Sequence, residues 1–576
     1  MDDVYDPLDE YANVFRDKFE QVAKDTFAQI AEEAQVDVKA NEETCRHLYD
    51  TEKIHSKVDE THGWYIFYWV ALWGIVAGGP LWALFKYHDL SIWALILIGV
   101  VVAGALWLQL TKVNPRRKEL QEQLNNLQQT INQYRDEAWQ QMWPLNRLFD
   151  WDILARMMSQ TVPKLQFDPY FTTQRLADLQ QVYGWDGSFN EGRSVLYSHS
   201  GLINGNPFVL CRTRKMVMST KTYEGSLTIY WTTEEKGSDG KYHIESHSQT
   251  LRAELEAPYP KYYEKTRLIY GNTAAPDLTF YREQSGLANK EGSLSYKWKH
   301  HKLQKKAQDL KNGDFALMTN EDFEVAFDTS DRNNNHQYAL LFTPLAQNTM
   351  LKLLKDKEIG FGDDFDFVKK KMINTIIPEH LQDMVIDFNP DQYSSFDYHK
   401  AESNFYEINA RYFKAIYFAL APLLCVPMYQ QIRSEKDIYG SDMPSHSSFW
   451  EHEALANFWG QDKFKHPQCV TKSILKTEET VQDNQSVITV YAHGYRCERR
   501  LSYISKKGND GQWHDVPVYW DDYQPVVGQG SMLIQEDNDN EDANITQSQR
   551  VGHISDVLDK AGMRVYRKHI ASKLRN

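Results

Sequence analysis

Two apolar runs, WYIFYWVALWGIVAGGPLWALF (Trp64–Phe85) and LSIWALILIGVVVAGALWLQL (Leu90–Leu110), decide the organisation of this chain. Each run continues for about twenty residues without a charged side chain, roughly the length that a helix needs to cross about 30 Å of hydrocarbon. Only the segment KYHD separates them, so two spans would return antiparallel through a tight turn. Aromatic side chains that suit the headgroup level lie toward the ends of the runs: Trp64, Tyr65, Tyr68, Trp82, Trp93 and Trp107. The sequence therefore predicts a transmembrane helical hairpin.

Basic residues flank the two apolar runs and predict their orientation. The segment between the runs carries one lysine, Lys86, which Asp89 balances. The outer flanks carry Lys53, Lys57, Lys112, Arg116, Arg117 and Lys118. Because Lys and Arg are enriched in cytoplasmic flanks, we expect a multi-pass protein of the cell membrane with both termini cytoplasmic. The N-terminal MDDVYDPLDEY lacks the pattern of a signal peptide, so we expect the first span to stay as an uncleaved anchor.

Composition narrows the functional classes. The chain has 576 residues and a net charge of -15, which argues against nucleic-acid binding because that function needs a basic surface. Its mean hydropathy of -0.60 shows that most of the chain is polar enough to lie outside a bilayer. The 5 cysteines are sparse and odd in number, so they form no disulfide framework and suit a reducing compartment.

Local patterns divide the chain into seven parts and predict an α+β fold with a helical stalk between the membrane hairpin and β-rich modules. The first three parts are an amphipathic helical region (1–63), the two-span hairpin (64–111), and a coiled-coil-like stalk with a linker (112–183). The others are a β-rich module (184–312), an α+β module ending in an apolar segment (313–430), a second β-rich module (431–537), and an acidic linker with a C-terminal helix (538–576).

The stalk is predicted from a heptad-like spacing. Its apolar positions are Leu120, Leu124, Leu127, Ile131, Tyr134 and Ala138. We expect this face to pack within the chain against the amphipathic N-terminal helix over about Leu8–Val38. An oligomerisation seam between copies of the chain is the alternative. Gly74 and Gly78 form a GxxxG step that favours close approach of helices, most simply within the hairpin.

Turn signals predict hairpins in both β-rich modules. Asp239-Gly240 lies in KGSDGKYH, and the similar KGNDGQWH occurs at Lys507–His514. In the α+β module, FEVAFDTSD and QYALLF look like strands. TPLAQNTMLKLLKD looks like a helix with Thr343 as N-cap and Pro344 at the first position. The final segment is expected to be a helix with Ile554, Leu558, Ala561 and Val565 on its apolar face.

Two further segments allow more than one interpretation. Tyr412–Tyr429 is apolar but contains Lys414, Pro422 and Pro427, which favours a buried core helix ending at Pro422 over an interfacial segment or a third span. Lys290–Asn312 is a lysine-rich helical connector. A solvated helix face is its ordinary interpretation, and contact with anionic lipid is the sharper one.

Candidate metal ligands occur in two places. His466, Cys469, His493 and Cys497 have an H-x2-C and H-x3-C spacing that a tetrahedral zinc site could use, provided that the chain turns at Gly494. Ordinary strand residues are the alternative, because positions four apart on a strand are about 13 Å apart. The carboxylates of Asp363, Asp364 and Asp366 could bind a hard cation or simply form a polar turn. We assign no catalytic, cofactor-binding or metal residue from these patterns.

The segment FEVAFDTSDRNNNHQYALLFTPLAQNTMLKLLKD (Phe323–Asp356) carries a resemblance to a known family. Together with the two apolar runs and the β stretch GNPFVL (Gly205–Leu210), it resembles a bacterial membrane-protein family of unknown function. Members have an N-terminal two-span hairpin and a large soluble domain, and some are encoded near LemA-like proteins. The extra part from about Phe413 onward departs from that pattern. The resemblance implies membrane anchoring and transfers no catalytic residue.

These patterns together favour a membrane-anchored scaffold or interaction protein with a large cytoplasmic domain. The expected partners are the lipid bilayer, another membrane or cytoplasmic protein, and in the oligomerisation alternative a second copy of the chain; nucleic acid is not expected. Two other hypotheses remain open at this point: a membrane-bound metal-dependent enzyme and a subunit of a channel or transporter. The transport hypothesis is weakened because neither apolar run contains an Asp, Glu, His, Lys or Arg that could relay protons.

Overall fold

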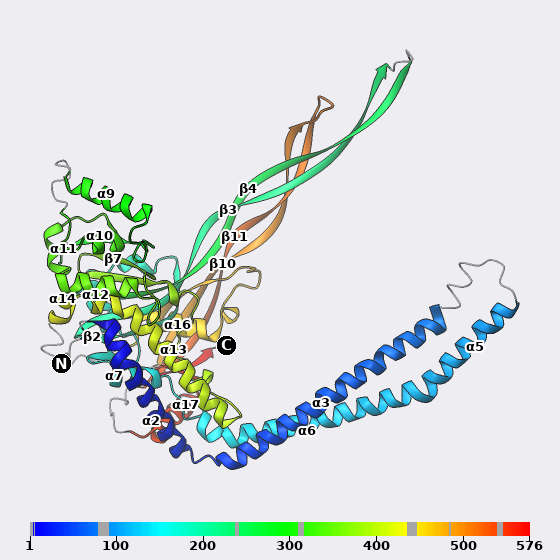
Figure 1. Ribbon diagram of the computed structural model, residues 1–576, viewed down its shortest axis with the longest axis horizontal. Coiled ribbons are helices and arrows are strands. Elements are labelled where there is room, and N and C mark those ends of the chain that lie inside the picture. The colour runs from blue at the N-terminus through cyan, green and yellow to red at the C-terminus, as the bar shows by residue number, and fades with distance from the viewer. Residues whose placement is uncertain are drawn as a thin grey trace. The chain divides into compact units, whose positions relative to one another are not determined.

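Helices dominate the N-terminal part of the chain and antiparallel sheets dominate the rest, so the fold is α+β (Figure 1). The structure is a computed structural model that describes residues 4, 6–78, 92–236, 241–308, 316–434, 446–482, 485–537 and 545–575. It divides into two units. The first unit contains Met1–Lys24, Trp151–Asn389 and Asn409–Asn576, and the second contains Asp25–Asp150 and Pro390–Ile408.

Two long antiparallel helical segments form most of the second unit. They are α3 (Val38–Trp73), continued by η2 (Gly74–Gly78), and the continuous helix of α5 (Ile92–Leu108), η3 (Gln109–Val113) and α6 (Asn114–Asn146). Gln141 Nε2 donates to Thr44 Oγ1 at 3.0 Å, whereas Arg135 Nη2 pairs with Glu52 at 2.7 Å. Contacts that move in opposite directions along the two sequences show that the helices are antiparallel (Figure 1).

The predicted periodic face of the stalk is the packed face of α6, because Leu120, Leu124, Ile131 and Ala138 are all buried. Its partner is α3, with Cys45 and Leu48 buried, rather than the Leu8–Val38 segment. That expectation was wrong because the first helices, α1 (Pro7–Glu10), η1 (Tyr11–Phe15) and α2 (Arg16–Ala34), have another packing partner: the rings of Tyr11 and Phe19 contact Phe413. The predicted turn between the apolar runs lies outside the described residues.

The Tyr412–Tyr429 segment forms a buried helix, which confirms the favoured interpretation over a third span. It lies in α13 (Tyr398–Leu424) and α14 (Pro427–Gln431), and α13 continues past Pro422 to Leu424. In the first unit, the ring of Phe413 stacks on that of Phe19 with 4.1 Å between centroids. Tyr417 Oη donates to Pro7 O at 2.8 Å, so side chains near the N-terminus cover the apolar face of α13.

An eight-stranded antiparallel sheet forms part of the first unit, with the order β1-β2-β3-β4-β8-β7-β5-β6. Its strands are β1 (Leu165–Phe167), β2 (Arg193–Ile203), β3 (Asn206–Lys236), β4 (Tyr242–Gly271), β5 (Thr279–Arg282), β6 (Thr329–Ser330), β7 (Phe365–Lys370) and β8 (Ile373–Pro378). Asn204 and Gly205, with φ of 51° and 74°, make the tight turn between β2 and β3. Strands from both sides of residue 312 share this sheet, so the predicted boundary at that position does not separate two sheets.

Short helices cover the module that we predicted to contain strands at FEVAFDTSD and QYALLF. These segments form α10 (Glu321–Phe327) and α11 (Asn335–Leu341), and only Thr329–Ser330 is strand. Asn320 and Asn334 cap the two helices by accepting from the backbone N–H groups three residues later, at 3.1 and 3.0 Å. Five alternating residues cannot distinguish a short buried helix from a strand, and these caps decide the outcome.

Other predicted helices of the first unit are confirmed. Thr343 Oγ1 accepts from Ala346 N at the start of α12 (Pro344–Lys355), and the lysine-rich connector forms α9 (Leu294–Gln308). The remaining helical segments are α7 (Ile153–Thr161), α8 (Thr173–Ala177), η4 (Asp178–Val182), η5 (Gly187–Asn190), η7 (Glu379–Leu381), α16 (Phe449–Trp459) and η9 (Gln461–Lys463). In the second unit, η8 (Pro390–Gln392) lies in the segment that precedes α13.

A second, five-stranded antiparallel sheet has the order β12-β13-β11-β10-β9. Its strands are β9 (Ile474–Gln482), β10 (Gln485–Lys507), β11 (Trp513–Glu536), β12 (Val565–Arg567) and β13 (Ile570–Arg575). The predicted C-terminal helix is α17 (Gln547–Ala561), but it ends there and Val565 begins a strand. Gly562, with φ of 60°, accepts the left-handed conformation that stops the helix.

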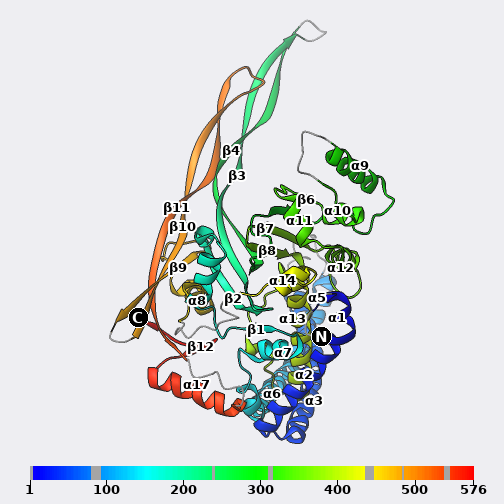
Figure 2. The same cartoon turned by 90° about the vertical axis from the view of Figure 1, so that its left-hand side faces the viewer.

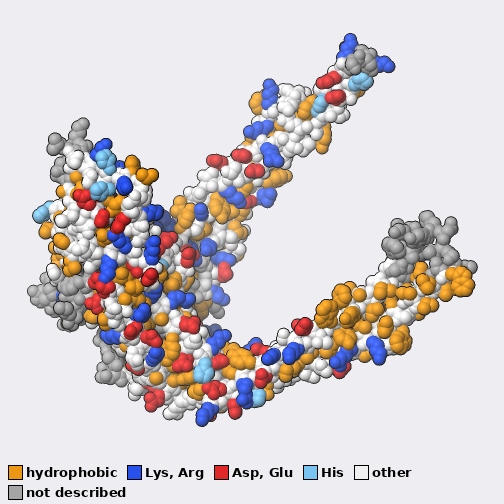
Figure 3. Space-filling model, in the orientation of Figure 1, with side chains coloured by type: hydrophobic (Ala, Val, Ile, Leu, Met, Phe, Trp, Pro, Cys, Tyr) orange, Lys and Arg blue, Asp and Glu red, His pale blue; other side chains and the backbone are white. Residues whose placement is uncertain are grey.

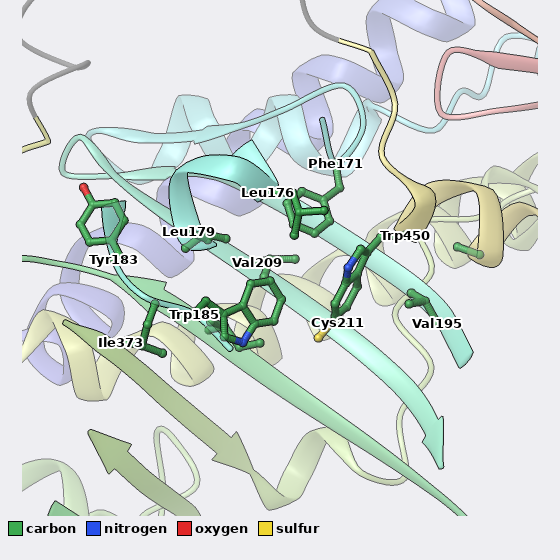
Figure 4. Close-up of a cluster of buried hydrophobic side chains, with 12 residues drawn as sticks. Phe171, Leu176, Leu179, Tyr183, Trp185, Val195, Val209, Cys211, Ile373 and Trp450 are labelled. Carbon is green, nitrogen blue, oxygen red and sulfur yellow. The ribbon is translucent and has the colours of Figure 1, made fainter. Parts of the chain in front are cut away.

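A cluster of buried side chains packs α8, η4 and α16 onto the eight-stranded sheet (Figure 4). The rings of Trp185 and Trp450 are 5.2 Å apart, and Cys211 and Val209 project from β3 into the same cluster. Both strands of the β3–β4 hairpin begin or end in this core. The hairpin is therefore anchored at its base and extends away from the cluster.

Candidate functional sites

Two β-ribbons project side by side from the sheets of the first unit (Figures 1 and 2). In the first ribbon, β3 and β4 pair from Phe208↔Tyr270 to Lys236↔Tyr242. In the second ribbon, β10 and β11 pair from Ser486↔Ile534 to Lys507↔Trp513. These pairings confirm both predicted hairpins, although Asp239-Gly240 itself lies outside the described residues. We call the paired ribbons the β-arm.

Side chains from both ribbons hold the β-arm together. Ile229 and Leu251 of the first ribbon form an apolar cluster with Val516 and Val518 of the second. The backbones approach so closely that a Cβ on Gly225 would lie 2.1 Å from Pro517 O, which explains the glycine there. Gln249 Oε1 accepts from Asn509 N at 2.8 Å, so the turn of the second ribbon is also fixed.

The outer surface of the β-arm exposes aromatic and aliphatic side chains. The most exposed are Tyr230, Tyr242, Ile244, Tyr503 and Trp513. β2 pairs with β3 no further than Lys215, and β8 pairs with β4 only from Leu268 onward. Among the described residues, β3 and β4 beyond these positions pair as strands only with each other, so their outer edges carry no further paired strand. Free edges with exposed aromatic rings are typical of surfaces that bind another molecule.

Exposed apolar side chains gather on the helices of the second unit, as seen on the face shown in Figure 3, and we call them the apolar belt. It consists of Trp64, Ile66, Phe67, Tyr68, Val70, Trp73, Ile75, Trp93, Ile96, Leu97, Val100, Val101, Trp107, Leu108 and Leu110. In the part of the chain that the structure describes, the helix Ile96–Asn146 is the one long and apolar enough to cross a membrane. That finding rests on length and composition, and residues 79–85 of the first run lie outside the described ranges.

One polar side chain joins the two helices inside this belt. Gln109, which is 1% exposed, can orient its amide so that Oε1 accepts from Trp69 Nε1 at 2.8 Å and from Trp73 Nε1 at 3.0 Å. Near the same end of the belt, the guanidinium of Arg117 lies 5.0 Å from the Trp69 ring centre. Sequence reasoning missed Gln109, although an amide in a nearly uniform apolar run was a usable signal.

The predicted GxxxG step makes no close helix contact in the described residues. A Cβ built on Gly74 or Gly78 meets no described atom within 4 Å. The predicted use of this step in packing the hairpin is therefore not supported.

The predicted His and Cys ligands are not brought together as a zinc site. β10 runs straight through Gly494, because the pairing with β11 continues from His493↔Val527 to Cys497↔Tyr523. Cys469 is buried and faces Gly494, where a Cβ would lie 2.4 Å from its Sγ. Across the described ranges, no group of three or more His, Cys, Asp or Glu side chains has the geometry of a metal site. His493 and Cys497 are ordinary residues of β10, whereas His466 and Cys469 lie in the segment before β9 (Ile474–Gln482).

The aspartates of GDDFDF take separate structural roles. Asp363 pairs with the fully buried Arg282, and Asp364 Oδ2 accepts from the backbone N of His380 at 2.9 Å. His380 Nδ1 lies 2.6 Å from the same oxygen. Asp366 lies in β7, and burial raises the pKa of its carboxyl. These contacts favour the polar-turn interpretation over a shared cation.

A buried ionic cluster, which sequence reasoning missed, fixes the β12–β13 hairpin in the first unit. Lys568 Nζ donates to Glu451 Oε1 at 3.0 Å and to the backbone oxygen of Ser198, and Ser198 Oγ donates to the same carboxylate oxygen at 2.9 Å. His569 Nε2 lies 2.6 Å from Asp152 Oδ2. Lys568 and His569 have φ of 49° and 61°, the left-handed region that side chains rarely adopt.

Burial and the neighbouring charges act in opposite directions on the pKa values of Glu451 and Lys568. Burial raises the pKa of Glu451, but Lys568 and Arg567 outweigh burial and hold that pKa below its usual value. Burial is the largest effect on Lys568 and lowers its pKa, whereas Glu451 opposes the change. The Lys568 Nζ and Glu451 Oε1 atoms form their hydrogen bonds within the protein. These contacts indicate a structural role for the cluster.

The comparisons with known proteins add no assignment. Neither protein-family models, nor curated proteins, nor solved structures give a match to this chain. The resemblance noted from the sequence therefore stays an expectation, and function is argued from the geometry alone.

Proposed function

We propose that this chain is an integral membrane protein, anchored by a two-span helical hairpin, whose β-arm binds another protein. In this proposal both termini and the first unit are cytoplasmic, and the stalk formed by α3 and α6 sets the distance from the bilayer. The chain then serves as a membrane-anchored scaffold.

The apolar belt is the observation that carries the proposal. Exposed patches of this length are rare on soluble proteins, because leaving a large apolar side chain in water forfeits about 1.5–3 kcal/mol. Trp64 and Tyr68 lie at one end of the first run, and the basic residues Lys112 and Arg116 follow the second. Rings and basic groups in these positions suit a membrane boundary.

The β-arm supports the second half of the proposal. Its rigid core, free edges and exposed rings resemble a binding surface more than a catalytic one. The two other hypotheses, a metal-dependent enzyme and a transport subunit, gain no specific observation from the described residues.

Membrane extraction and sidedness test the anchor. The chain should stay in the membrane pellet after alkaline carbonate treatment, and its release would overturn the proposal. For sidedness, Tyr87→Cys and Lys507→Cys would be labelled with a membrane-impermeant maleimide, with Cys497→Ser as background because the other native thiols are buried. We expect Tyr87→Cys to react in intact cells and Lys507→Cys only after lysis. The reverse pattern would contradict the orientation.

Photocrosslinking tests the β-arm. A benzophenone amino acid would replace Tyr230 or Trp513 in the full-length chain in its own membranes, with Lys357 as a matched exposed control outside the β-arm. We expect a discrete protein adduct from both β-arm positions and none from the control. Absence of adducts at both positions would contradict a protein-binding role.

A further inference from the structure

Helix α9 packs against the first unit by one face only. Tyr296 and Leu303 are buried and cluster with Val325 of α10. Around them, Lys299 Nζ pairs with Asp328 at 2.6 Å and His300 Nε2 with Glu321 at 2.5 Å. These contacts fix the rotation of α9 about its axis and so determine which side chains point away from the rest of the first unit.

The opposite face of α9 combines apolar and basic side chains. Leu294 is 87% exposed and Trp298 is 66% exposed. The exposed basic positions on this face are Lys297, His301, Lys302 and Lys305. Together these residues recur at steps of three and four, which is the spacing of one helix face. Lys302 Nζ lies 5.3 Å from the centre of the Trp298 ring, so a cation sits beside the exposed aromatic.

The charge of α9 contrasts with that of the whole chain. Its sequence, LSYKWKHHKLQKKAQ, contains five lysines, two histidines and no carboxylate, whereas the chain carries a net charge of -15. A purely solvated face would not need two large apolar side chains, Leu294 and Trp298, exposed to water. A tryptophan and a leucine bordered by lysines match the boundary of an anionic bilayer, where rings lie at headgroup level and lysines reach phosphates.

We propose that α9 is an interfacial helix that binds the anionic surface of a lipid bilayer. Leu294 and Trp298 enter the headgroup region, and Lys297, Lys302 and Lys305 contact the lipid phosphates. This rests on the proposed function in one respect: membrane anchoring keeps the chain at a lipid surface. The helix adds a second, reversible contact that depends on lipid charge.

An environment-sensitive dye on α9 tests this inference in the full-length chain. His301→Cys, in a Cys497→Ser background, would carry the nitrobenzoxadiazole label, since the other native thiols are buried. The protein would be placed in nanodiscs of phosphatidylcholine alone or with phosphatidylglycerol. Vesicles of the two compositions would also be added to the neutral discs. We expect a blue shift with anionic lipid, either in the disc or in the added vesicles, and its reduction by salt.

A charge-matched pair of variants separates the helix from general electrostatics. Lys297→Glu/Lys302→Glu/Lys305→Glu should weaken the response to anionic lipid at least about tenfold. Lys357→Glu/Lys371→Glu/Lys506→Glu changes three exposed lysines elsewhere by the same charge and should leave it intact. Trp298→Ser should also weaken it, which a purely ionic attraction would not produce.

Two outcomes would overturn the inference. One is an unchanged dye spectrum both in discs with phosphatidylglycerol and with anionic vesicles added to neutral discs, while the chain remains in the discs. This outcome would not contradict the proposed membrane anchor. The other is a shift with poly-glutamate but none with anionic lipid, which assigns the face to an acidic protein segment. Failure of the chain to enter the discs would instead contradict the anchor itself.

Discussion

Two apolar helical segments of this chain have opposite surroundings. In α5, Leu97 is 69% exposed and Val100 is 66% exposed, whereas in α13 Leu420 is 1% exposed. Both segments are apolar enough to be considered membrane spans from sequence. The difference is the covering partner: Tyr11 and Phe19 pack their rings on Phe413 of α13. Whether an apolar helix is buried in the protein or stays exposed therefore depends on which segments of its own chain pack against it.

The largest effect should come from placing a charge in each segment. Leu420→Arg buries a guanidinium without a partner. We expect it to lower the free energy of unfolding of the first unit by more than about 4–5 kcal/mol. Leu97→Arg should impair membrane insertion by about 2.5–3.5 kcal/mol and leave unfolding of the first unit unchanged. Chemical unfolding in nanodiscs, followed by circular dichroism of the sheets, measures the first effect. Equal effects of the two changes on that transition would remove the distinction.

The buried Glu451–Lys568 ion pair of the first unit provides a second test, because a buried charge needs a partner whereas the exposed apolar belt needs none within the chain. Glu451→Gln leaves Lys568 buried without its counter-ion, and we expect a loss of about 3–5 kcal/mol. Glu451→Gln/Lys568→Met should recover part of this loss, because it removes the uncompensated charge. Urea unfolding of the three proteins checks the prediction. A double variant less stable than Glu451→Gln would contradict the prediction and show that the hydrogen bond from Lys568 to the backbone oxygen of Ser198 outweighs removal of the unpaired charge.

A buried lysine, Lys369, should make the stability of the first unit depend on pH. Burial lowers the pKa of Lys369 to about 7, while the unfolded chain keeps a value near 10.4. The unfolded state then binds more protons between these values, so stability should rise with pH from about 7 upward, by a few kcal/mol in order of magnitude. Lys369→Met should flatten this slope, and Lys371→Met, at an exposed position, should not. Unfolding between pH 6 and about 9.5 would measure the difference.

The smallest effect concerns the helix pair of the second unit. Gln109→Leu removes the acceptor for two indole N–H groups, and we expect the pairing of the two helices to weaken by about 0.6–1.7 kcal/mol. Gln109→Glu keeps an acceptor and should weaken it less if the carboxylate stays near the interface. Disulfide trapping between cysteines placed at Thr44 and Gln141 reports the pairing in membranes. An unchanged trapping yield for Gln109→Leu would show that packing alone holds the helices.

Local chemistry made part of the fold predictable. The Thr343-Pro344 start of α12 and the glycine turn of the second ribbon at Gly508–Gly511 are decided by neighbours in sequence. The buried state of Tyr412–Tyr429 was also predictable, because its prolines and Lys414 are poorly suited to lipid.

Long-range pairing made the rest unpredictable. Glu451, Ser198 and Lys568 are ordinary polar residues until the fold brings them together, and Lys568 is 370 positions from Ser198. The joining of β4 with β8 across residue 312 has the same origin. The helices α10 and α11 were missed for a different reason, because short amphipathic patterns are ambiguous and the capping asparagines were not weighed.

The ionic cluster also imposes an order on synthesis. Asp152 meets His569, 417 positions later, and Glu451 meets Lys568, 117 positions later. The ribosome delivers the apolar helix α5 long before it delivers Lys568 or His569. Glu451 is therefore synthesised before Lys568, and a nascent chain interrupted between them would lack this counter-ion. Such incomplete chains would be less stable and therefore more readily degraded by proteases. Complete translation would then be needed for the protein to accumulate.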